Sequence, residues 1–320
     1  MNMKKYDVTA LGELLIDFTE NGNSAQGNPL FEANPGGAPC NVLAMLAKLG
    51  HKTAFIGKVG MDFFGEQLKN AIEEVGIDAD YLCMDNEIHT TLALVHTLAD
   101  GDRDFSFYRN PGADMMLTEE EVPEKLLGDT KIFHFGTLSM THEGVRCATK
   151  KALKLAKENG ALISFDPNLR PPLWSSLDEA KEQVLYGLGF CDVLKISDNE
   201  IQWLTGETDY SEGVRWIRER YPDIRLILVS MGRDGSRAYY GDSMVEVPAY
   251  LQKGTIETTG AGDTFCGCVL HFICDHGLEK LSKEDLTKML KFANAAASLI
   301  TLKKGALRVM PEIPEIQSLL

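Results

Sequence analysis

A run of small residues, Thr258–Phe265, precedes a helical pattern that continues to His276 and stops at Gly277. Small residues at a helix start let backbone N–H groups converge on an anion, and the helix dipole favours negative charge there. Asp263 adds a carboxylate at the same helix start. Two interpretations are open: Asp263 caps the helix in a tight turn, or it lies beside a bound phosphate and accepts a proton from an attacking hydroxyl.

Two other phosphate-binding patterns do not fit the chain. The sequence contains no Gly-x-x-x-x-Gly-Lys-Ser/Thr, and Gly57-Lys58 lacks the preceding glycine at the required spacing. A dinucleotide-binding fingerprint would need a third glycine where Phe265 stands and would follow the first strand, whereas Gly260–Gly262 lies late in the chain. A P-loop and a Rossmann fingerprint are therefore not supported.

A second candidate site lies near the N-terminus. Gly12–Asp17 leaves the first predicted strand, and Asn34–Asn41, which contains paired glycines, opens the next predicted helix. Paired glycines permit close approach of a ligand to the backbone, and Asp17 and Asn41 could hydrogen-bond the hydroxyl groups of a polyol. The alternative is a glycine-rich turn before an amphipathic helix, and both interpretations stay open here.

The cysteines favour reduced thiols. Seven of them, an odd number, are scattered through a chain long enough to form a full core. Cys266–His276 concentrates cysteine and histidine within eleven residues, but its spacing is not that of a zinc ribbon or finger. Since Phe265–Cys274 is also strongly apolar, a buried helix is favoured over a metal site.

Short apolar runs alternate with helical patterns along most of the chain. Near-continuous apolarity is typical of strands covered on both faces. Five such strands are predicted at Val8–Leu11, Ile132–Phe135, Ala161–Phe165, Val193–Ile196 and Leu226–Val229. Helix starts with an acidic residue three positions on are predicted at Thr118, Ser176 and Ser282. The pattern predicts an α/β fold with a doubly wound, mainly parallel sheet.

Two segments interrupt this alternation. Thr90–Thr97 and Arg103–Arg109 are β-rich, and the turn-forming Ala99–Asp102 between them predicts an antiparallel hairpin. Phe18–Pro35 is polar and too long for a bare connection, so it is expected to add strands to that hairpin. Together the two pieces would form a small β-sheet lid.

Length and composition set the domain organisation. A chain of 320 residues corresponds to about two domains, or to one large α/β domain with an appendage. The lid segments favour the second arrangement. We therefore expect a single α/β domain over residues 1–320, with the lid inserted from about 14–35 and 88–112.

The net charge and the N-terminal residues restrict which binding partners and which cell compartment we expect. The chain has 32 basic and 47 acidic residues, a net charge of −15, and no long basic run, which argues against nucleic acid. No apolar stretch approaches the roughly 20 residues of a membrane helix. Met1–Asp7 lacks the features of a signal peptide, so we expect a cytoplasmic protein.

The two candidate sites together resemble the paired signatures of the ribokinase-like (PfkB) sugar kinases, and the chain is most similar to their fructokinase branch. The signatures are Gly36–Asn41 and Thr258–Asp263. Further runs follow the family's order over essentially the whole chain, at Gly57–Gly65, Phe107–Arg109, Phe165–Arg170 and Ser230–Gly235.

The resemblance implies a ribokinase-like fold in which the sugar lies between the carboxyl edge of the sheet and the lid, with ATP in a neighbouring groove. It implies that Asp263 is the catalytic base and that the N–H groups of Gly260, Ala261 and Gly262 form an anion hole. The implied sugar-binding residues are Asp17, Gly36, Gly37, Asn41, Arg109, Asn168 and Arg170. The implied nucleotide-binding residues are Lys195, Ser230, Gly232, Gly235 and Asn294.

Two positions depart from the family pattern. Ser197–Glu200 stands where many relatives have Asn-x-x-Glu near Mg²⁺ and phosphate, and it also fits a capping box. Glu200 is expected to organise Mg²⁺-bound water. Glu257 replaces an Asp of a loop that holds a monovalent cation in many relatives, so activation by K⁺ is only a hypothesis.

The activity implied by the resemblance is ATP-dependent phosphorylation of the primary hydroxyl of a ketohexose, D-fructose to fructose 6-phosphate. The alternatives are another sugar, such as 2-keto-3-deoxygluconate or ribose, a nucleoside, or a sugar-binding regulator that has lost catalysis. A lid with one exposed face also predicts a homodimer formed through the Thr90–Arg109 region.

Overall fold

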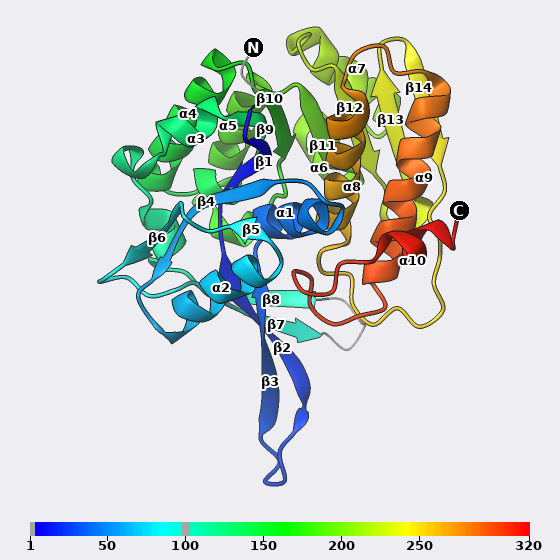
Figure 1. Cartoon of the computed structure of the whole chain (residues 1–320). Coiled ribbons are helices and arrows are strands. Elements are labelled where there is room, and N and C mark those ends of the chain that lie inside the picture. Colours follow the sequence, from blue (N-terminus) through cyan, green and yellow to red (C-terminus); the bar gives the residue numbers. More distant parts are fainter. Residues whose placement is uncertain (1–3, 98–102) are drawn as a thin grey trace.

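The computed structural model describes residues 4–97 and 103–320. Its main sheet has ten strands, in the order β14-β13-β12-β11-β10-β9-β1-β4-β5, with β6 beside β4 (Figure 1). The strands are β1 (Tyr6–Leu11), β4 (Thr53–Gly60), β5 (Ile77–Asp78), β6 (Leu82–Asp85), β9 (Thr130–Gly136), β10 (Leu162–Asp166), β11 (Val193–Ser197), β12 (Leu226–Ser230), β13 (Ser236–Tyr240) and β14 (Ser243–Val247).

In this sheet β1, β4, β5, β6, β9, β10, β11 and β12 run parallel, and β13 and β14 add an antiparallel edge. The five predicted strands are confirmed as the cores of β1, β9, β10, β11 and β12. All eight residues of β4 are buried, as expected of a strand with helices on both faces. Parallel strands bring their carboxyl ends to one edge of the sheet, and that edge positions the site.

Helices cover both faces of the sheet. One face packs against α1 (Ala38–Lys48), α2 (Phe63–Glu74), α8 (Ala261–His276), α9 (Lys283–Ile300) and α10 (Ile313–Gln317). The other face packs against α3 (Glu124–Gly128), α4 (Glu143–Glu158), α5 (Leu177–Leu188), α6 (Asp198–Thr205) and α7 (Tyr210–Arg220). Alternation along β12 shows the division: Leu226 and Leu228 enter the first core, whereas Ile227 and Val229 enter the second. The predicted doubly wound fold is confirmed.

A second, separate sheet has the order β3-β2-β7-β8. It contains β2 (Leu15–Asn23), β3 (Pro29–Gly36), β7 (Leu92–Thr97) and β8 (Arg103–Tyr108). The pairing of β2 with β7 joins the two predicted pieces, and β7 pairs antiparallel with β8 as expected. The β2–β3 hairpin projects away from the body of the molecule (Figure 1). The predicted turn, Ala99–Asp102, lies outside the described residues.

The predicted helix starts have different outcomes. Ser176 caps α5, and Ser282 forms a capping box at α9 with Asp285. Thr118 also forms a capping box, but only a short 3₁₀ turn, Glu119–Glu121, follows it. The expectation of a longer helix there is wrong because Pro123 holds the preceding residue in an extended conformation.

The cysteine-rich stretch is a buried helix, as predicted. Cys266 and Cys268 pack in the core on α8, and all seven cysteines are free thiols. None of the helices in the described part of the chain is long and apolar enough to cross a membrane.

Candidate active site

Two cavities meet at the start of α8, beyond the carboxyl ends of the parallel strands. The first has a volume of about 550 Å³ and contains residues from β2, α1, the β10–α5 loop and the 255–263 segment. The second has a volume of about 660 Å³ and lies between the β12–β13 turn, the 249–258 segment and α9. Both cavities are lined by Thr255, Thr258 and Gly262. A chemical group bound at this junction could therefore contact a ligand in either cavity.

The backbone at the start of α8 forms the junction. Gly260 is the N-cap, with a φ of 76° that favours glycine, and the Thr264 N–H donates to its carbonyl at 2.8 Å. Asp263 therefore lies in the first turn and does not cap the helix. Of the three predicted anion-hole N–H groups, that of Ala261 donates to the Thr258 carbonyl at 3.2 Å. First-turn N–H groups have no partner within the helix, so the positive end of α8 faces the junction.

Asp263 and Asn41 are joined by a hydrogen bond across the first cavity, which both residues line. The Asn41 Nδ2 donates to Asp263 Oδ2 at 2.8 Å, which fixes the orientation of the amide. Asn41 Oδ1 is buried and has no hydrogen-bond partner among the residues that the structure describes. Burial raises the pKa of Asp263, and the Asn41 hydrogen bond with the charges of Lys195 and Arg170 offsets part of the rise.

Lys195 and Asp166 form a buried ion pair beside the junction. Their Nζ and Oδ2 atoms are 2.9 Å apart, and both side chains are more than nine-tenths buried. Burial alone would lower the pKa of Lys195, but the carboxylates of Asp166 and Glu200 raise it, so the ammonium stays charged. A Cβ added at Gly262 would lie 3.3 Å from Lys195 Nζ. The cation thus lies directly beside the helix start, on the side of the first cavity.

Asn168 and Arg170 also line the first cavity. Asn168 has a φ of 44°, a left-handed conformation that asparagine tolerates, and its Oδ1 accepts from Arg170 Nη1 at 2.7 Å. The Leu169 N–H between them donates to Glu200 Oε1 at 2.7 Å. Glu200 therefore fixes the loop that carries both residues.

Glu200 forms the predicted capping box with Ser197 at the start of α6. Its Oε2 accepts from the Ser197 N–H and Oγ, each at 2.8 Å, and the residue does not line either cavity. The position that resembles the family's metal site thus has a clear structural role.

The glycine pair before α1 lets two strands approach closely. A Cβ at Gly36 would lie 2.4 Å from Asp17 Oδ2, and one at Gly37 would lie 2.4 Å from the Glu13 carbonyl oxygen. Asp17 and Gly37 line the first cavity, whereas Gly36 does not. Gly36 therefore makes room for the Asp17 carboxylate.

Glu13 is a site residue that the sequence analysis did not single out. It is buried, lines the first cavity and accepts from the Ala38 N–H at 2.8 Å. Burial raises the pKa of Glu13 to about 7, although hydrogen bonds from backbone N–H groups oppose the rise. A charged residue at the end of an apolar strand was the signal that could have identified it.

Arg109, which the resemblance places at the sugar, is not among the residues that line the first cavity. Its guanidinium is buried and binds Asp114, with Nε and Nη2 at 2.8 and 2.7 Å from Oδ2. It also donates to Thr141 Oγ1 at 2.8 Å and to the Leu138 carbonyl at 3.0 Å. Leu138 lines the cavity, so the hydrogen bond from Arg109 to its carbonyl helps to hold the cavity wall in place.

The second cavity is lined by four of the five residues expected in the nucleotide groove: Ser230, Gly232, Gly235 and Asn294. The fifth, Lys195, lines the first cavity. Asn294 accepts from Ser236 Oγ at 2.9 Å and donates to the Val247 carbonyl at 3.0 Å, so its amide shapes the wall. Apolar residues that the sequence analysis missed complete this cavity: Tyr250, Leu251, Phe265 and Ala297. A partly apolar cavity beside a helix start suits a nucleotide base and its phosphates.

Glu257 lies in the segment between the two cavities and lines the first. It is buried, and its Oε2 accepts from the Gly305 N–H at 3.2 Å. This contact links the 255–259 segment to the loop after α9.

Comparison with known proteins gives a consistent result. Residues 5–313 match the sequence model of the pfkB family carbohydrate kinases. The probable fructokinase-2 of Arabidopsis thaliana is 40% identical over 318 residues, which cover 98% of this chain and 95% of the relative.

Two solved structures extend the similarity to the fold. The fructokinase of Xylella fastidiosa with bound ATP has a TM-score of 0.88 at 29% identity and covers 98% of this chain and 97% of its own. A double mutant of the fructokinase of Vibrio cholerae O395, with fructose, ADP and potassium ion bound, has a TM-score of 0.87 at 28% identity, with both chains fully covered.

Proposed function

The chain belongs to the pfkB family of carbohydrate kinases, and from this we propose that it transfers the γ-phosphoryl group of ATP to the primary hydroxyl of D-fructose, giving fructose 6-phosphate. The observation that carries the proposal is the meeting of the two cavities at Gly262, with Asp263 on the side of the first. A sugar in the first cavity and ATP in the second would bring hydroxyl and γ-phosphate together there.

The first cavity offers hydrogen-bonding groups for a sugar. Asn41 Oδ1 is a buried acceptor in need of a donor, and a sugar hydroxyl would supply it. Asp17 adds a carboxylate from β2, and Asn168 an amide from the opposite wall. Such buried polar groups reject a ligand that lacks the matching hydroxyls.

Asp263 is the proposed general base. Its raised pKa makes it a better proton acceptor than an exposed aspartate, and the Asn41 hydrogen bond holds one carboxylate oxygen in place. The proton of the attacking hydroxyl would pass to Asp263 while the hydroxyl oxygen forms its bond to the γ-phosphorus. The bond from that phosphorus to the bridging oxygen of the β-phosphate would break, and ADP would leave. The side chain needs no movement to act.

Charge on the transferring group would be stabilised at the junction by three features: the start of α8, the Lys195 ammonium and the Arg170 guanidinium. Phosphoryl transfer depends mostly on positioning and electrostatic stabilisation, and these groups are held in place before substrate binds. Lys195 is fixed by Asp166, and Arg170 by Asn168.

A divalent metal ion accompanies ATP in this proposal, and Mg²⁺ is the ion we infer. The donor chemistry fits, because Asp166 and Glu200 supply carboxylate oxygens near Lys195, whose pKa both of them raise. Glu200 would hold the ion through water, since backbone and hydroxyl groups already bind both of its oxygens. When bound, Mg²⁺ neutralises charge on the phosphates.

Activation by K⁺ is a further part of the proposal. Glu257 and the loops that it links through Gly305 would form the cation site next to the 258–263 segment. The test compares turnover in K⁺ with turnover in a buffer whose only cation is bulky and organic. Equal rates would reject K⁺ activation and leave the sugar kinase assignment intact.

We also infer that the second sheet is a lid on a single kinase domain and that it mediates a homodimer. Leu30, Phe31 and Tyr108 are exposed apolar residues on this sheet. Their burial against a second copy would stabilise the dimer. A monomeric mass in light scattering at assay concentration would reject the dimer.

The decisive experiment measures ADP release from ATP and Mg²⁺ with a panel of fructose, ribose, 2-keto-3-deoxygluconate and nucleosides. We expect the highest kcat/KM with fructose. A higher value with another member would keep the reaction and change the substrate. Sugar binding by calorimetry without ADP release from any member would identify a regulator instead.

A further inference from the structure

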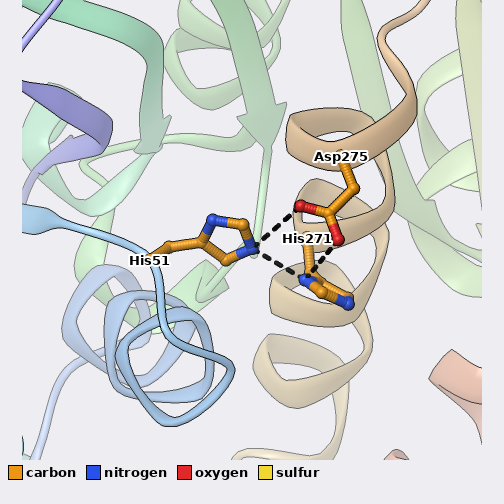
Figure 2. A group of neighbouring side chains, drawn as sticks. All are labelled: His51, His271 and Asp275. Carbon is orange, nitrogen blue, oxygen red and sulfur yellow. Dashed lines mark hydrogen bonds and ion pairs between the residues drawn. The ribbon is translucent and has the colours of Figure 1, made fainter.

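Three polar side chains meet at the end of the sheet opposite the candidate active site. His51 lies in the turn between α1 and β4, and His271 and Asp275 lie on the last turns of α8 (Figure 2). Since α8 has 16 residues, it is about 24 Å long, and its first turn holds Asp263. The cluster is thus a different site on the same helix.

The three groups direct their polar atoms toward one another (Figure 2). His51 Nε2 and His271 Nδ1 are 2.7 Å apart, so one ring donates a proton to the other. The Asp275 oxygens lie 3.9 Å from His51 Nε2 and 3.7 Å from His271 Nδ1. One atom from each residue lies within 4.8 Å of the others.

These separations suit a small cation. Zn–N bonds of about 2.0–2.1 Å in a tetrahedral site place ligand atoms roughly 3.3 Å from each other. The Asp275 oxygens are already close to that spacing. The two nitrogens would separate by about 0.6 Å as the shared proton is replaced by the metal ion.

A second carboxylate lies near His51. Asp7 Oδ2 is 3.7 Å from His51 Nδ1, and Asp7 is itself fixed by Lys131 Nζ at 2.7 Å and the Lys52 N–H at 2.9 Å. A carboxylate beside the ring nitrogen that faces away from the ion is the usual outer shell of a metal-bound histidine. The other nitrogen, Nε2, lies in the cluster, 2.7 Å from His271 Nδ1.

The surroundings leave a path to solvent on one side. The His51 side chain is 10% exposed and that of Asp275 is 49% exposed, so an ion could reach the cluster past Asp275 and water could complete its coordination. The His271 side chain is 24% exposed. Cys274 neighbours Asp275 on α8, but its thiol is not part of the group of three ligand atoms that lie within reach of one another in the described residues.

We propose that His51, His271 and Asp275 bind one Zn²⁺ or similar divalent transition metal ion, which ties the end of α8 to the α1–β4 turn. Imidazole nitrogens favour such ions over Mg²⁺ and Ca²⁺, which require oxygen ligands. The site is independent of the proposed kinase reaction, because it lies at the other end of the helix.

The test titrates the full-length chain, freed of metal by a chelator that is then removed, with Zn²⁺ against a chromogenic chelator. We expect the wild type to bind one Zn²⁺ more per chain than His271→Ala. His276→Ala is the matched control, since this exposed histidine on the same helix is outside the cluster. Asp263→Asn should retain the ion, which separates this site from any metal bound with ATP.

Three further measurements extend the test. Asp7→Asn should weaken Zn²⁺ binding roughly tenfold as an outer-shell change. Zn²⁺ should raise the Tm of the wild type and not that of His271→Ala. Visible absorption of bound Co²⁺ should show nitrogen coordination in the wild type alone. If His271→Ala does not fold, His51→Gln tests the same ligand set from the other element.

Several outcomes would overturn the proposal. Absence of Zn²⁺ binding by the wild type would mean that the two imidazoles form only a hydrogen bond. Equal stoichiometry in the wild type, His271→Ala and His51→Gln would place the ion elsewhere. Loss of binding in Cys274→Ser, with binding kept in His51→Gln, would identify a thiol site.

Discussion

The two cavities that meet at Gly262 contain different kinds of residue. The first is lined by ionisable side chains from several strand ends, among them Glu13, Asp17 and Lys195. The second is lined by glycines, small polar groups and apolar side chains such as Tyr250 and Leu251. The first cavity therefore offers a ligand fixed charges and hydrogen-bonding groups, and the second offers mainly apolar and backbone surface.

This difference predicts how each cavity responds to substitution. In the first, side chains hold one another, as Asn41 holds Asp263 and Asp166 holds Lys195. Removing one partner leaves another buried polar group unpaired, which costs more than the lost contact. In the second, a side chain can be shortened without leaving a charge unpaired. Substitutions in the first cavity should therefore reduce activity and stability much more than substitutions in the second.

Asp263→Asn should have the largest effect. The substitution keeps the size of the side chain but removes the proton acceptor, so we expect kcat to fall at least about a hundredfold. Fructose binding, measured by calorimetry, should survive because the hydroxyl acceptors on Asn41 and Asp17 remain. His276→Ala at the far end of α8 is the control and should keep full turnover. Near-normal turnover of Asp263→Asn would remove its assignment as the base.

Lys195→Met should affect both activity and stability. It leaves the Asp166 carboxylate buried without its partner, and breaking a buried ion pair costs about 3–5 kcal/mol of unfolding free energy. We also expect kcat to fall at least about tenfold through the lost charge beside Gly262. Urea unfolding and steady-state kinetics measure the two effects.

The double variant Lys195→Met/Asp166→Asn separates these effects of Lys195. It removes the unpaired carboxylate, so most of the stability should return while kcat stays low. Recovery of both quantities would show that Lys195 is structural and contributes nothing to phosphoryl transfer.

Glu13→Gln tests the cost of a buried charge in the first cavity. A carboxyl whose pKa is raised from 4.5 to about 7 binds its proton more tightly in the folded state. Unfolding then releases protons, so the stability of the wild type falls as pH rises from about 4.5 to about 7 and levels off above that. The loss is at most about 3 kcal/mol. Glutamine keeps the acceptor for the Ala38 N–H without a charge.

The measurement is the difference in unfolding free energy between Glu13→Gln and the wild type at pH 5 and pH 8. We expect the free energy of unfolding of Glu13→Gln, relative to that of the wild type, to be higher at pH 8 than at pH 5. Glu20→Gln, a change on the exposed part of β2, is the comparison variant and is measured at the same two pH values. A difference that is the same at both pH values would contradict a raised pKa at Glu13.

Sequence reasoning was most successful where local residues determine the structure. Runs such as Leu226–Val229 are apolar throughout because both faces of the sheet are covered, so they could be predicted as strands without knowing their neighbours. The start of α8 was also predictable, since Gly260 has a positive φ that favours glycine. Thr118 shows the limit of this approach, because its capping signal was sound but Pro123 ended the helix.

Site residues that depend on topology were harder to predict. Asp166 and Lys195 are single charges in apolar runs, and they acquire a role only when β10 and β11 bring them side by side. The position of Arg109 in its motif does not reveal which neighbour binds the guanidinium, and here Asp114 does so. His51 and His271 are 220 residues apart, so no local spacing could have linked them.

Leu251→Ala should have the smallest effect and sharpens the contrast between the cavities. Leu251 is 64% exposed and lines only the second cavity, so truncation removes part of an apolar wall and leaves no polar group unpaired. Loss of roughly 1 kcal/mol of apolar contact would raise the KM for ATP about fivefold, with the KM for fructose unchanged. Leu177→Ala, an exposed leucine on α5 outside both cavities, is the control and should change neither constant. If Leu251→Ala instead raised the KM for fructose, the two cavities would not divide the substrates as proposed.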